Sequence, residues 1–373
     1  NGNDGITLGA ISGGLQFASI YPMTPITNLL HNLALYQEKY GFIYKQPEDE
    51  ISAINMAIGA SIAGARSLTA TSGGGFCLMT EGMGLAGITE TPLVIILGMR
   101  AGPSTGLPTW SEAGDLKLAL SAGHGEFPKI VLSAGDSREA FDLTKEAFNL
   151  ADIYQTPVIL LMDKNICEND QSFLVLENSS KIERGKLSFE TIADYQRYDL
   201  SDDGISERSV PGSGNFFIAN SDEHNTYGFD DEEIENRNIQ MNKRMLKMQT
   251  CAKNDMPAPL VFGPEKADLT LVSWGSTKGA ILEGLKSFFN VNFLYLTWMN
   301  PFPTEYVRNI LAEAKYIVDI ENNFSGDLAN LIREKTGIEI TDKMLKYDGR
   351  PFFKEEIEEK IRSIVIANDG GQI

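Results

Sequence analysis

The chain has 373 residues, of which 42% are hydrophobic and 22% charged, and its formal net charge at pH 7 is −19. This composition is typical of a soluble globular protein, and the length predicts two domains at roughly 150 residues each. Nucleic acid and anionic membrane surfaces are excluded as partners, because both are bound through clustered lysine and arginine side chains.

Residues 4–163 alternate between helical and strand patterns. Helices are expected at 4–15, 26–41, 48–67, 76–88 and 137–155, and strands at 17–22, 42–46, 67–72, 92–100, 129–134 and 157–163. The alternation predicts an α/β fold with a parallel sheet covered by helices on both faces. Ligands of such sheets bind at the carboxyl ends of the strands, so functional residues are expected there.

Residues 164–262 are rich in acidic residues, Gly, Ser and Asn. A solvated connector is one interpretation; we favour a long excursion that ends in a helix at 231–248, with mixed charges on its exposed side. A second α/β series follows, with strands at 267–276, 291–299 and 315–322 and helices at 277–289, 304–314 and 326–337. The sequence therefore predicts one domain over 1–250, including an acidic connector at about 164–250, and a smaller one over 262–373.

The segment PEDEISAINMAIGASIAGARS begins a helix with three acids, Glu48, Asp49 and Glu50. Acids at a helix start are commonly explained by the helix dipole and by capping of free N–H groups. Glu50, however, leads into an apolar face through Ile51 and Ile54. A carboxylate that faces a partly dry pocket is a candidate acid–base group. We expect Glu50 to be buried near the carboxyl edge of the sheet, with no Lys or Arg in ion-pair distance.

The segment TATSGGGFCLMTEGMG places the glycines 73–75 between a strand that ends at Ser72 and a helix. A phosphate cradle at the helix start is one interpretation, and a tight strand–helix turn with close packing is the other. A P-loop is excluded, because no Gly-Lys-Ser/Thr follows, and the dinucleotide fingerprint is a weak match.

The segment RAGPSTGLPT follows a buried strand, so Arg100 should lie at the carboxyl edge of the sheet. Ser104, Thr105 and Thr109 add hydroxyl groups to the loop. A plain surface loop is one interpretation, but polar loops at strand ends are also where ligands bind. An arginine there suits a carboxylate, which it can hold with two hydrogen bonds.

Histidines and cysteines indicate no metal centre on this chain. The three histidines, His31, His124 and His224, show no metal-ligand spacing with another His or a Cys. The three cysteines form no CxxC pair, which argues against a disulfide framework, a zinc site and a chain-borne iron–sulfur cluster. No apolar stretch reaches the roughly 18 residues of a membrane span. We expect a reducing, cytoplasmic setting.

Long segments spread over nearly the whole chain fit one known family. They are YPMTPIT, EDEISAINMAIGASIAGARS, TATSGGGFCLMTEGMGLAGITETPLVII, RAGPSTGLPT, GDLKLALSAGHGEFPKIVL, AFNLADIYQTPVILLMD, WGSTKGAI, NPFP, IENNFSG and YDGRPF. Together they resemble the α subunit of 2-oxoacid:ferredoxin oxidoreductases, in particular the 2-oxoglutarate branch. The resemblance implies a thiamine-diphosphate-binding-type parallel sheet domain that binds the cofactor's pyrimidine, over 1–250, and a smaller transketolase C-terminal-like α/β domain over 262–373.

The resemblance also implies roles for individual residues. Glu50 falls where the family's glutamate faces N1′ of the cofactor's aminopyrimidine, and Ser72 and Gly73 fall beside the cofactor. Thr24 falls on a residue that contacts the substrate near its reactive carbon, and Arg100 and Thr109 on positions that recognise 2-oxoacid carboxylates. The two prolines of YPMTPIT would then restrict the backbone, so that the Thr24 hydroxyl has little entropy to lose. We expect these substrate residues to converge on one pocket, with Arg100 within about 10 Å of Thr24.

The implied reaction is oxidative decarboxylation of a 2-oxoacid to acyl-CoA and CO2, with reduction of ferredoxin. The chain has no GDG-plus-Asn motif for a diphosphate and its metal. A β subunit is therefore expected to supply the diphosphate and Mg2+ site and an iron–sulfur cluster, with coenzyme A as acyl acceptor. The N-terminus resembles the point where some relatives carry a fused γ domain upstream, and we expect the chain to be a fragment or a processed product. A γ, or γ and δ, subunit or domain is a further expected partner.

Three departures from the family pattern concern a turn near the cofactor, the connector and the second domain. The family often has Ser-Gly-Pro-Gly where this chain has Ser-Gly-Gly-Gly at 72–75, so Gly74 replaces a proline. It commonly has Ser-Pro-Arg where this chain has Ser206, Glu207 and Arg208, and it usually has a Gln where Asp327 stands. Two alternatives stay open. One is a subunit of another thiamine-dependent complex, of transketolase-like or dehydrogenase E1 β type, and the other is a non-catalytic assembly partner.

Overall fold

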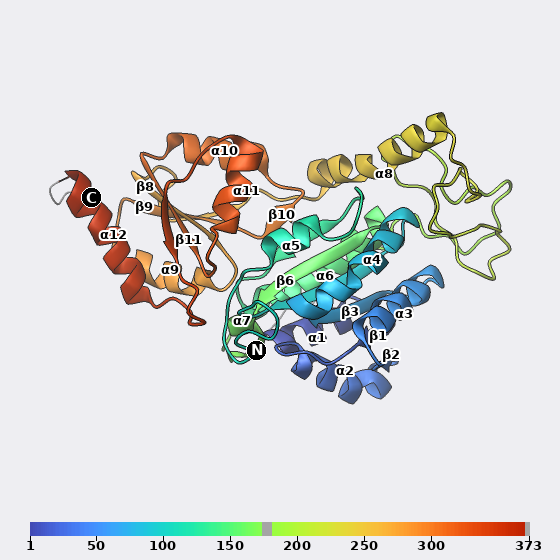
Figure 1. Ribbon diagram of the computed structural model, residues 1–373, viewed down its shortest axis with the longest axis horizontal. Helices are drawn as coiled ribbons and strands as arrows, with labels where there is room; N and C mark the ends of the chain where they lie inside the picture. The colour runs from blue at the N-terminus through green and yellow to red at the C-terminus, as the bar shows by residue number, and fades with distance from the viewer. Residues whose placement is uncertain (174–180, 370–373) are drawn as a thin grey trace.

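The computed structural model describes residues 1–173 and 181–369 (Figure 1). Two α/β blocks are built on separate sheets, and a long excursion projects from the first block, away from the second. The first block comprises residues 1–168, the excursion residues 181–254 and the second block residues 260–369. Among the described residues, no helix is both long enough and apolar enough to cross a bilayer.

The first sheet is parallel in all its pairings but one. Its strands are β1 (Phe17–Ile20), β2 (Ile43–Lys45), β3 (Ser67–Ser72), β4 (Leu93–Met99), β5 (Ile130–Ser133), β6 (Pro157–Asp163) and β10 (Trp298–Asn300), in the order β10-β5-β6-β4-β3-β1-β2. The predicted parallel sheet is confirmed, and β3 and β6 have the predicted bounds. The sheet gathers the carboxyl ends of β1, β3 and β4 side by side, which positions the loops that follow them.

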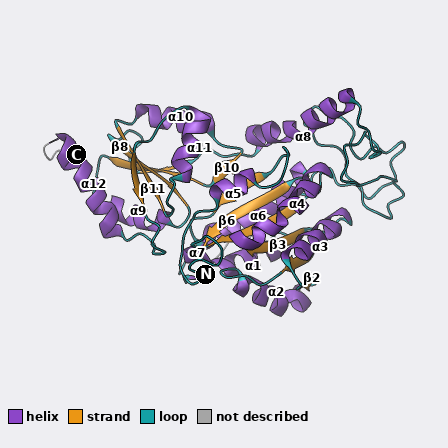
Figure 2. Ribbon diagram, viewed as in Figure 1, coloured by secondary structure: helices purple, strands orange, loops and turns teal. Residues whose placement is uncertain are grey.

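Helices cover both faces of this sheet, as predicted (Figure 2). One face carries α1 (Gly2–Ser12), α2 (Thr27–Tyr40), α6 (Ser137–Tyr154) and the short α7 (Lys164–Glu168), and the other carries α3 (Glu50–Ile62), α4 (Gly73–Ile88) and α5 (Leu116–Ser121). Side chains alternate along β4: Val94 and Ile96 join the core under α1 and α6, and Ile95 and Leu97 the core under α3 and α4. Both cores are fully buried, as expected for a doubly covered parallel sheet.

Three differences from the expected elements concern short helices and one helix start. The short helices α5 and α7 were not expected, since six and five residues are too few to show a clear helical period. Helix α4 begins at Gly73 rather than at residue 76, so the glycine run forms its first turn. This position of the glycines bears directly on the candidate site.

The second sheet has the order β12-β11-β8-β9-β7. Its strands are β7 (Leu260–Phe262), β8 (Leu269–Trp274), β9 (Val291–Leu296), β11 (Tyr316–Glu321) and β12 (Asp342–Leu345), and its helices α9 (Thr277–Leu285), α10 (Thr304–Glu313), α11 (Asp327–Thr336) and α12 (Lys354–Asp369). Strands β7 and β12 and helix α12 lie outside the predicted elements. Leu294 and Leu328 belong to the same buried cluster as Ile95 and Phe76, so one hydrophobic core continues across both blocks.

Strand β10 crosses from the second block to the first. The segment 291–299, expected as one strand, is divided into β9 and β10 at Thr297. Strand β10 pairs antiparallel with β5, and the Ser133 amide donates to the Thr297 carbonyl at 2.7 Å. The second block therefore supplies an edge strand to the first sheet.

The excursion packs against the first block, and the interpretation of a plain solvated connector is wrong for part of it. Tyr198, Arg208 and His224 are buried. The helix α8 (Ile234–Asn254) follows, close to the predicted bounds, but its buried residues include Lys243 and Lys247. The sequence pattern, which predicts mixed charges on the exposed side of this helix, does not reveal that these two lysines are buried, where a carboxylate of the first block pairs with them. Figure 1 shows α8 returning from the excursion towards the second block.

Candidate active site

Glu50 is the first residue of α3 and lies at the carboxyl end of β3. The preceding Asp49 caps the helix by accepting a hydrogen bond from the Ser52 amide at 2.7 Å, which leaves Glu50 free to turn inward. Glu50 is 3% exposed, and its Oε1 atom has no hydrogen-bond partner among the described residues. No ion pair of Glu50 occurs within 1–173 and 181–369, so its predicted burial without a cation is confirmed. Ile54 is buried beneath it, whereas Ile51 is half exposed, so the apolar face lies on one side only.

Gly75 lies directly against this carboxyl group. A Cβ atom at Gly75 would overlap Glu50 Oε1 and Thr71 Oγ1 and would lie 2.8 Å from Glu50 Cδ. Only glycine can therefore bring the first turn of α4 this close to Glu50. A buried carboxylate oxygen with no partner is costly, so the arrangement suits a ligand that supplies a hydrogen-bond donor.

Ser72 and Gly73 form the junction between β3 and α4. Ser72 is 1% exposed and stands at the N-cap position without a side-chain capping bond. A Cβ at Gly73 would lie 2.7 Å from a carboxylate oxygen of Asp115, the residue that precedes α5. Burial, followed by the charge of Asp327, raises the pKa of Asp115 to about 6. A carboxylate at this helix start disfavours a phosphate there, so the tight-turn interpretation fits better than the phosphate cradle.

Thr24 and Arg100 lie together, as predicted. Each follows the end of a strand, β1 for Thr24 and β4 for Arg100, and Arg100 Nη1 donates to the Thr24 backbone carbonyl at 2.9 Å. The contact is possible because Gly98 has no side chain: a Cβ there would lie 2.6 Å from Ile26 and 3.1 Å from Pro25. The Thr24 hydroxyl forms no hydrogen bond within the described part of the chain. Arg100 forms no ion pair with the described carboxylates, so its remaining donors are available to a ligand.

The loop after β1, which carries Thr24, approaches Glu50 through a contact between Met23 and Thr71. Thr71 Oγ1 lies 4.0 Å from Met23 Sδ, a long sulfur contact, and the same Oγ1 touches the position that a Gly75 Cβ would take. Thr24, Arg100 and Glu50 therefore belong to neighbouring strand ends of one edge, with Met23 and Thr71 between them.

Thr109 is exposed, and within the described residues it forms no hydrogen bond with Thr24 or Arg100. The neighbouring Trp110 stacks under the Arg350 guanidinium at 3.6 Å, and the Ser111 amide donates to the Gly349 carbonyl at 3.0 Å. These contacts hold the end of the loop against the second block. The structure therefore shows a direct contact between two of the three predicted substrate residues, Thr24 and Arg100, and the convergence of Thr109 with them stays a prediction.

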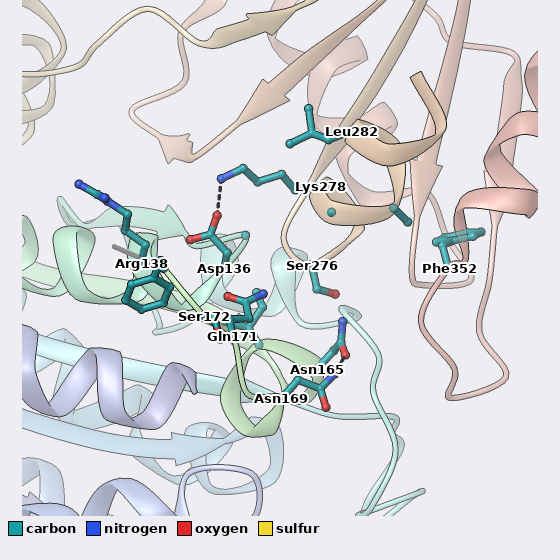
Figure 3. Close-up of a pocket in the computed structure, with 15 residues that line it drawn as sticks. Asp136, Arg138, Asn165, Asn169, Gln171, Ser172, Ser276, Lys278, Leu282 and Phe352 are labelled. Carbon is teal, nitrogen blue, oxygen red and sulfur yellow. Dashed lines mark hydrogen bonds and ion pairs between the residues drawn. The ribbon is translucent and has the colours of Figure 1, made fainter. Parts of the chain in front are cut away.

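A separate pocket lies between the two blocks, where the loops after β5, β6 and β8 meet (Figure 3). Its volume is about 570 Å³, and none of the predicted site residues lines it. Lys278 of α9 points across it to Asp136 of the first block at 2.6 Å. Glu139 takes a second contact with Lys278, so the cation is already neutralised by two carboxylates.

Sequence reasoning missed three residues of the site, Thr71, Gly75 and Asp115. The glycine run drew attention to Gly73, but the sequence contains nothing to show that the third glycine is the one that meets Glu50. Asp115 lies 42 residues after Gly73 in the sequence and reaches it only through the fold. Among the described residues, no group of three or more His, Cys, Asp or Glu could hold a metal ion.

Comparison with protein families shows a match over residues 8–243 to the family "Pyruvate flavodoxin/ferredoxin oxidoreductase, thiamine diP-bdg". The chain is similar to the 2-oxoacid:ferredoxin oxidoreductase subunit alpha of Saccharolobus solfataricus, with 39% identity over 98% of this chain and 61% of the relative. It is also similar to the 2-oxoglutarate synthase subunit KorA of Methanothermobacter thermautotrophicus, with 30% identity over 95% of this chain and 96% of the relative. The chain thus spans about three fifths of the first relative and nearly all of the second.

Solved structures give the same result. A 2-oxoglutarate:ferredoxin oxidoreductase from Magnetococcus marinus, with 2-oxoglutarate, coenzyme A and succinyl-CoA bound, superimposes with a TM-score of 0.93 at 36% identity, over 97% of this chain and 64% of that chain. A split-gene transketolase, described as an inactive β4 tetramer, matches with a TM-score of 0.52 at 13% identity, over 98% of this chain and 96% of that chain. The second match shows the fold alone, and it agrees with the transketolase-like architecture of the two blocks.

Proposed function

Because the chain belongs to the α-subunit family of the 2-oxoacid:ferredoxin oxidoreductases, with their thiamine-diphosphate-binding domain, we propose that it takes part in oxidative decarboxylation of a 2-oxoacid. The products are an acyl-CoA and CO2, and the electrons reduce ferredoxin. We assign residues 1–250 to the pyrimidine-binding domain with its acidic connector and residues 262–373 to the transketolase C-terminal-like domain.

The unpartnered carboxylate of Glu50 is the observation that carries this proposal. Glu50 Oε1 is buried, lies against Gly75 and has no cation or donor among the described residues. A protonated ring nitrogen would satisfy it, so these residues fit the aminopyrimidine of thiamine diphosphate. When bound, the cofactor supplies an electron sink for the carbon that loses CO2. Glu50 holds the proton at the ring nitrogen, and Ser72 and Gly73 border the same side of the site.

We assign recognition of the 2-oxoacid to Thr24, Arg100 and Thr109. Arg100 has donors left after its bond to the Thr24 carbonyl, and a guanidinium can hold a carboxylate with two hydrogen bonds. Thr24 offers a hydroxyl group on the same edge as Glu50. Thr109 would join them from the loop that contacts the second block. The names of the KorA relative and of the Magnetococcus structure favour 2-oxoglutarate as the substrate.

A β subunit is proposed to complete the site, because the start of α4, the candidate phosphate cradle of the described chain, does not suit a diphosphate. Asp115 lies against Gly73 at the start of α4, where its charge would repel a phosphate. The β subunit would carry the diphosphate and Mg2+ site and an iron–sulfur cluster, and coenzyme A would accept the acyl group. A γ, or γ and δ, subunit or domain is a further proposed partner, and the complex is proposed to be cytoplasmic.

The test is to produce the full chain with its proposed β subunit and to measure 2-oxoacid-dependent reduction of a viologen dye. We expect reduction only when both subunits, thiamine diphosphate, Mg2+ and coenzyme A are present, and fastest with 2-oxoglutarate. The isolated chain should bind thiamine diphosphate only weakly. Calorimetry that shows micromolar, Mg2+-dependent binding to the isolated chain would contradict the division of the site between two subunits.

A further inference from the structure

The loop that follows β4, residues 101–111, is closed on itself by backbone hydrogen bonds. Ala101 and Leu107 form an antiparallel bridge, in which the Leu107 amide donates to the Ala101 carbonyl at 2.9 Å. The Trp110 amide in turn donates to the Leu107 carbonyl at 3.0 Å. A displacement of Trp110 is therefore passed through the loop to its first residue, which follows Arg100 directly in the chain.

The second block holds the far end of this loop through the turn 346–351, between β12 and α12. The Arg350 guanidinium stacks on the indole of Trp110, with its central carbon 3.6 Å from the ring centroid. A Cβ at Gly349 would lie 2.9 Å from Trp110 Cβ and 3.1 Å from Leu107 Cδ1. Gly349 also has a φ of +85°, which glycine adopts without strain. The turn therefore fits against the loop at a point that leaves no room for a side chain.

The turn is itself fixed, so the guanidinium is presented to the indole in one position. Asn322, which is buried, donates to the carbonyls of Lys346 and Arg350 at 2.7 and 3.2 Å. Among the described residues Arg350 forms no ion pair, and its Nη1 donates to the Asp348 carbonyl at 2.8 Å. The charge of Arg350 thus faces an aromatic ring rather than a carboxylate. A guanidinium over the face of a tryptophan is attracted by the ring quadrupole, and tryptophan gives the strongest attraction of this kind.

We propose that Arg350 is a positioning residue for the 2-oxoacid and acts through Trp110. The stack holds the loop 101–111 in place, and with it Arg100 and Thr109. This inference rests on the proposed function, because it takes these two residues to bind the substrate. An ordered loop loses little conformational freedom when the substrate binds, whereas a loose loop must be ordered in the same step, which weakens the affinity. Arg350 therefore raises the affinity for the substrate without touching it.

Arg350→Met in the complex with the β subunit tests the effect on affinity. The KM for the 2-oxoacid should rise about fivefold or more, from the loss of a contact between a cation and an aromatic ring. The kcat at saturating substrate should stay unchanged, because the lost contact affects binding and the reaction alike. Arg333→Met is the matched control, since Arg333 is an exposed arginine of the second block that pairs with Glu339. An unchanged KM in Arg350→Met, or a fall in kcat alone, would overturn the proposal.

Two variants of Trp110 separate the stack from a general effect on folding. Trp110→Phe keeps an aromatic face and should retain much of the native affinity, whereas Trp110→Leu should raise the KM as Arg350→Met does. The double variant Trp110→Leu, Arg350→Met should raise the KM no further than either single change, because both remove the same contact. Independent effects that multiply in the double variant would show that the two residues act separately and would contradict the inference.

Hydrogen exchange of the full chain tests the loop without an activity assay. The amides of Leu107 and Trp110 are hydrogen-bonded within the loop and should exchange about fivefold faster in Arg350→Met, since the loop opens more often. Arg333→Met should keep the native rates. Native exchange rates in Arg350→Met would show that Arg350 does not hold the loop and would overturn the proposal. A native complex that reduces no viologen with any 2-oxoacid would instead contradict the proposed function, and exchange separately decides whether Arg350 holds the loop.

Discussion

Arg100 Nη1 donates a hydrogen bond of 2.9 Å to the backbone carbonyl of Thr24, across a separation of 76 residues. The two residues meet because the parallel strands β1 and β4 flank β3 and end at the same edge of the sheet. The bond also fixes the proline-bounded loop relative to the guanidinium. A change at Arg100 therefore affects the position of Thr24 as well as the charge available to a substrate.

Glu50→Gln in the complex with the β subunit should reduce turnover at least about a hundredfold, because the glutamine cannot hold the ring nitrogen's proton as a carboxylate does. The unfolding temperature should stay equal or rise, since the change removes a buried, unpaired charge. Glu48→Gln is the matched control, an exposed acid two residues earlier that should leave turnover unchanged. Near-normal turnover of Glu50→Gln would contradict the proposed role.

Gly75→Ala should impair the site although Glu50 itself is not substituted. The added methyl group overlaps Glu50 Oε1 and Thr71 Oγ1, so the carboxylate must move. Turnover should fall by about tenfold or more, in line with misplacement of a reacting group. Gly74→Ala is the control, because a Cβ there meets nothing within 4 Å. It should leave turnover unchanged and stabilise the helix by about 0.5–1 kcal/mol, measured by thermal unfolding. Equal turnover of the two variants would contradict the close approach.

Arg100→Ala should lower kcat/KM for 2-oxoacids about 30-fold or more, from the loss of a charge-assisted partner at roughly 2–5 kcal/mol. The thiamine diphosphate concentration at half-maximal activity should change little. Arg138→Ala is the control, because this arginine is half exposed and pairs with Asp142. If the charge of the side chain dominates substrate recognition, Arg100→Lys should recover part of the rate. If the two hydrogen bonds of the guanidinium to the carboxylate dominate, Arg100→Lys should recover none of it. Unchanged kcat/KM in Arg100→Ala would remove the arginine from substrate recognition.

Asp115 should make stability depend on pH. Burial raises its pKa to about 6 in the folded chain, above the ordinary value of 3.8 for an aspartate, so the native state binds more protons than the unfolded state between these values. The stabilisation of the folded state that this raised pKa gives is fully present below the pKa of Asp115 in the unfolded chain, and it is lost as the pH rises through about 6. Asp115→Asn should therefore flatten the decline between about pH 4 and 6 and stabilise the chain at pH 7 by on the order of 1–3 kcal/mol. Denaturant unfolding across this pH range checks the effect, with the half-exposed Asp142→Asn as control. The same slope in Asp115→Asn and in the native chain would contradict the raised pKa.

Glu90→Gln should detach the excursion. The change leaves Lys243 and Lys247 buried without a carboxylate, at a cost of about 3–5 kcal/mol. Limited proteolysis should then cut within residues 181–254 at lower protease concentrations than in the native chain. Adding Lys247→Met should recover part of the loss, because one of the two uncompensated charges is removed. Equal protease sensitivity of Glu90→Gln and the native chain would show that the pair does not hold the excursion.

The layered sheet and the meeting of Thr24 with Arg100 could be predicted from the sequence, because strand ends of a parallel sheet gather at one edge. The burial of Glu50 followed from its place at the start of an apolar helix. Gly75 and Asp115 could not be found, since their importance lies in contacts between segments that the chain brings together only on folding. The burial of Lys243 and Lys247 in α8 could not be predicted, because a helix pattern does not reveal a carboxylate on another element.

The placement of β10 limits how this chain can be divided. A cut between residues 250 and 262 gives two pieces of plausible domain size, but the C-terminal piece takes β10 with it. Strand β5 then loses the partner that covers its outer side, and its backbone N–H and C=O groups become a template for association with other chains. The two blocks are therefore not interchangeable modules: a chimera that exchanges the C-terminal part between relatives also replaces the border strand of the N-terminal sheet.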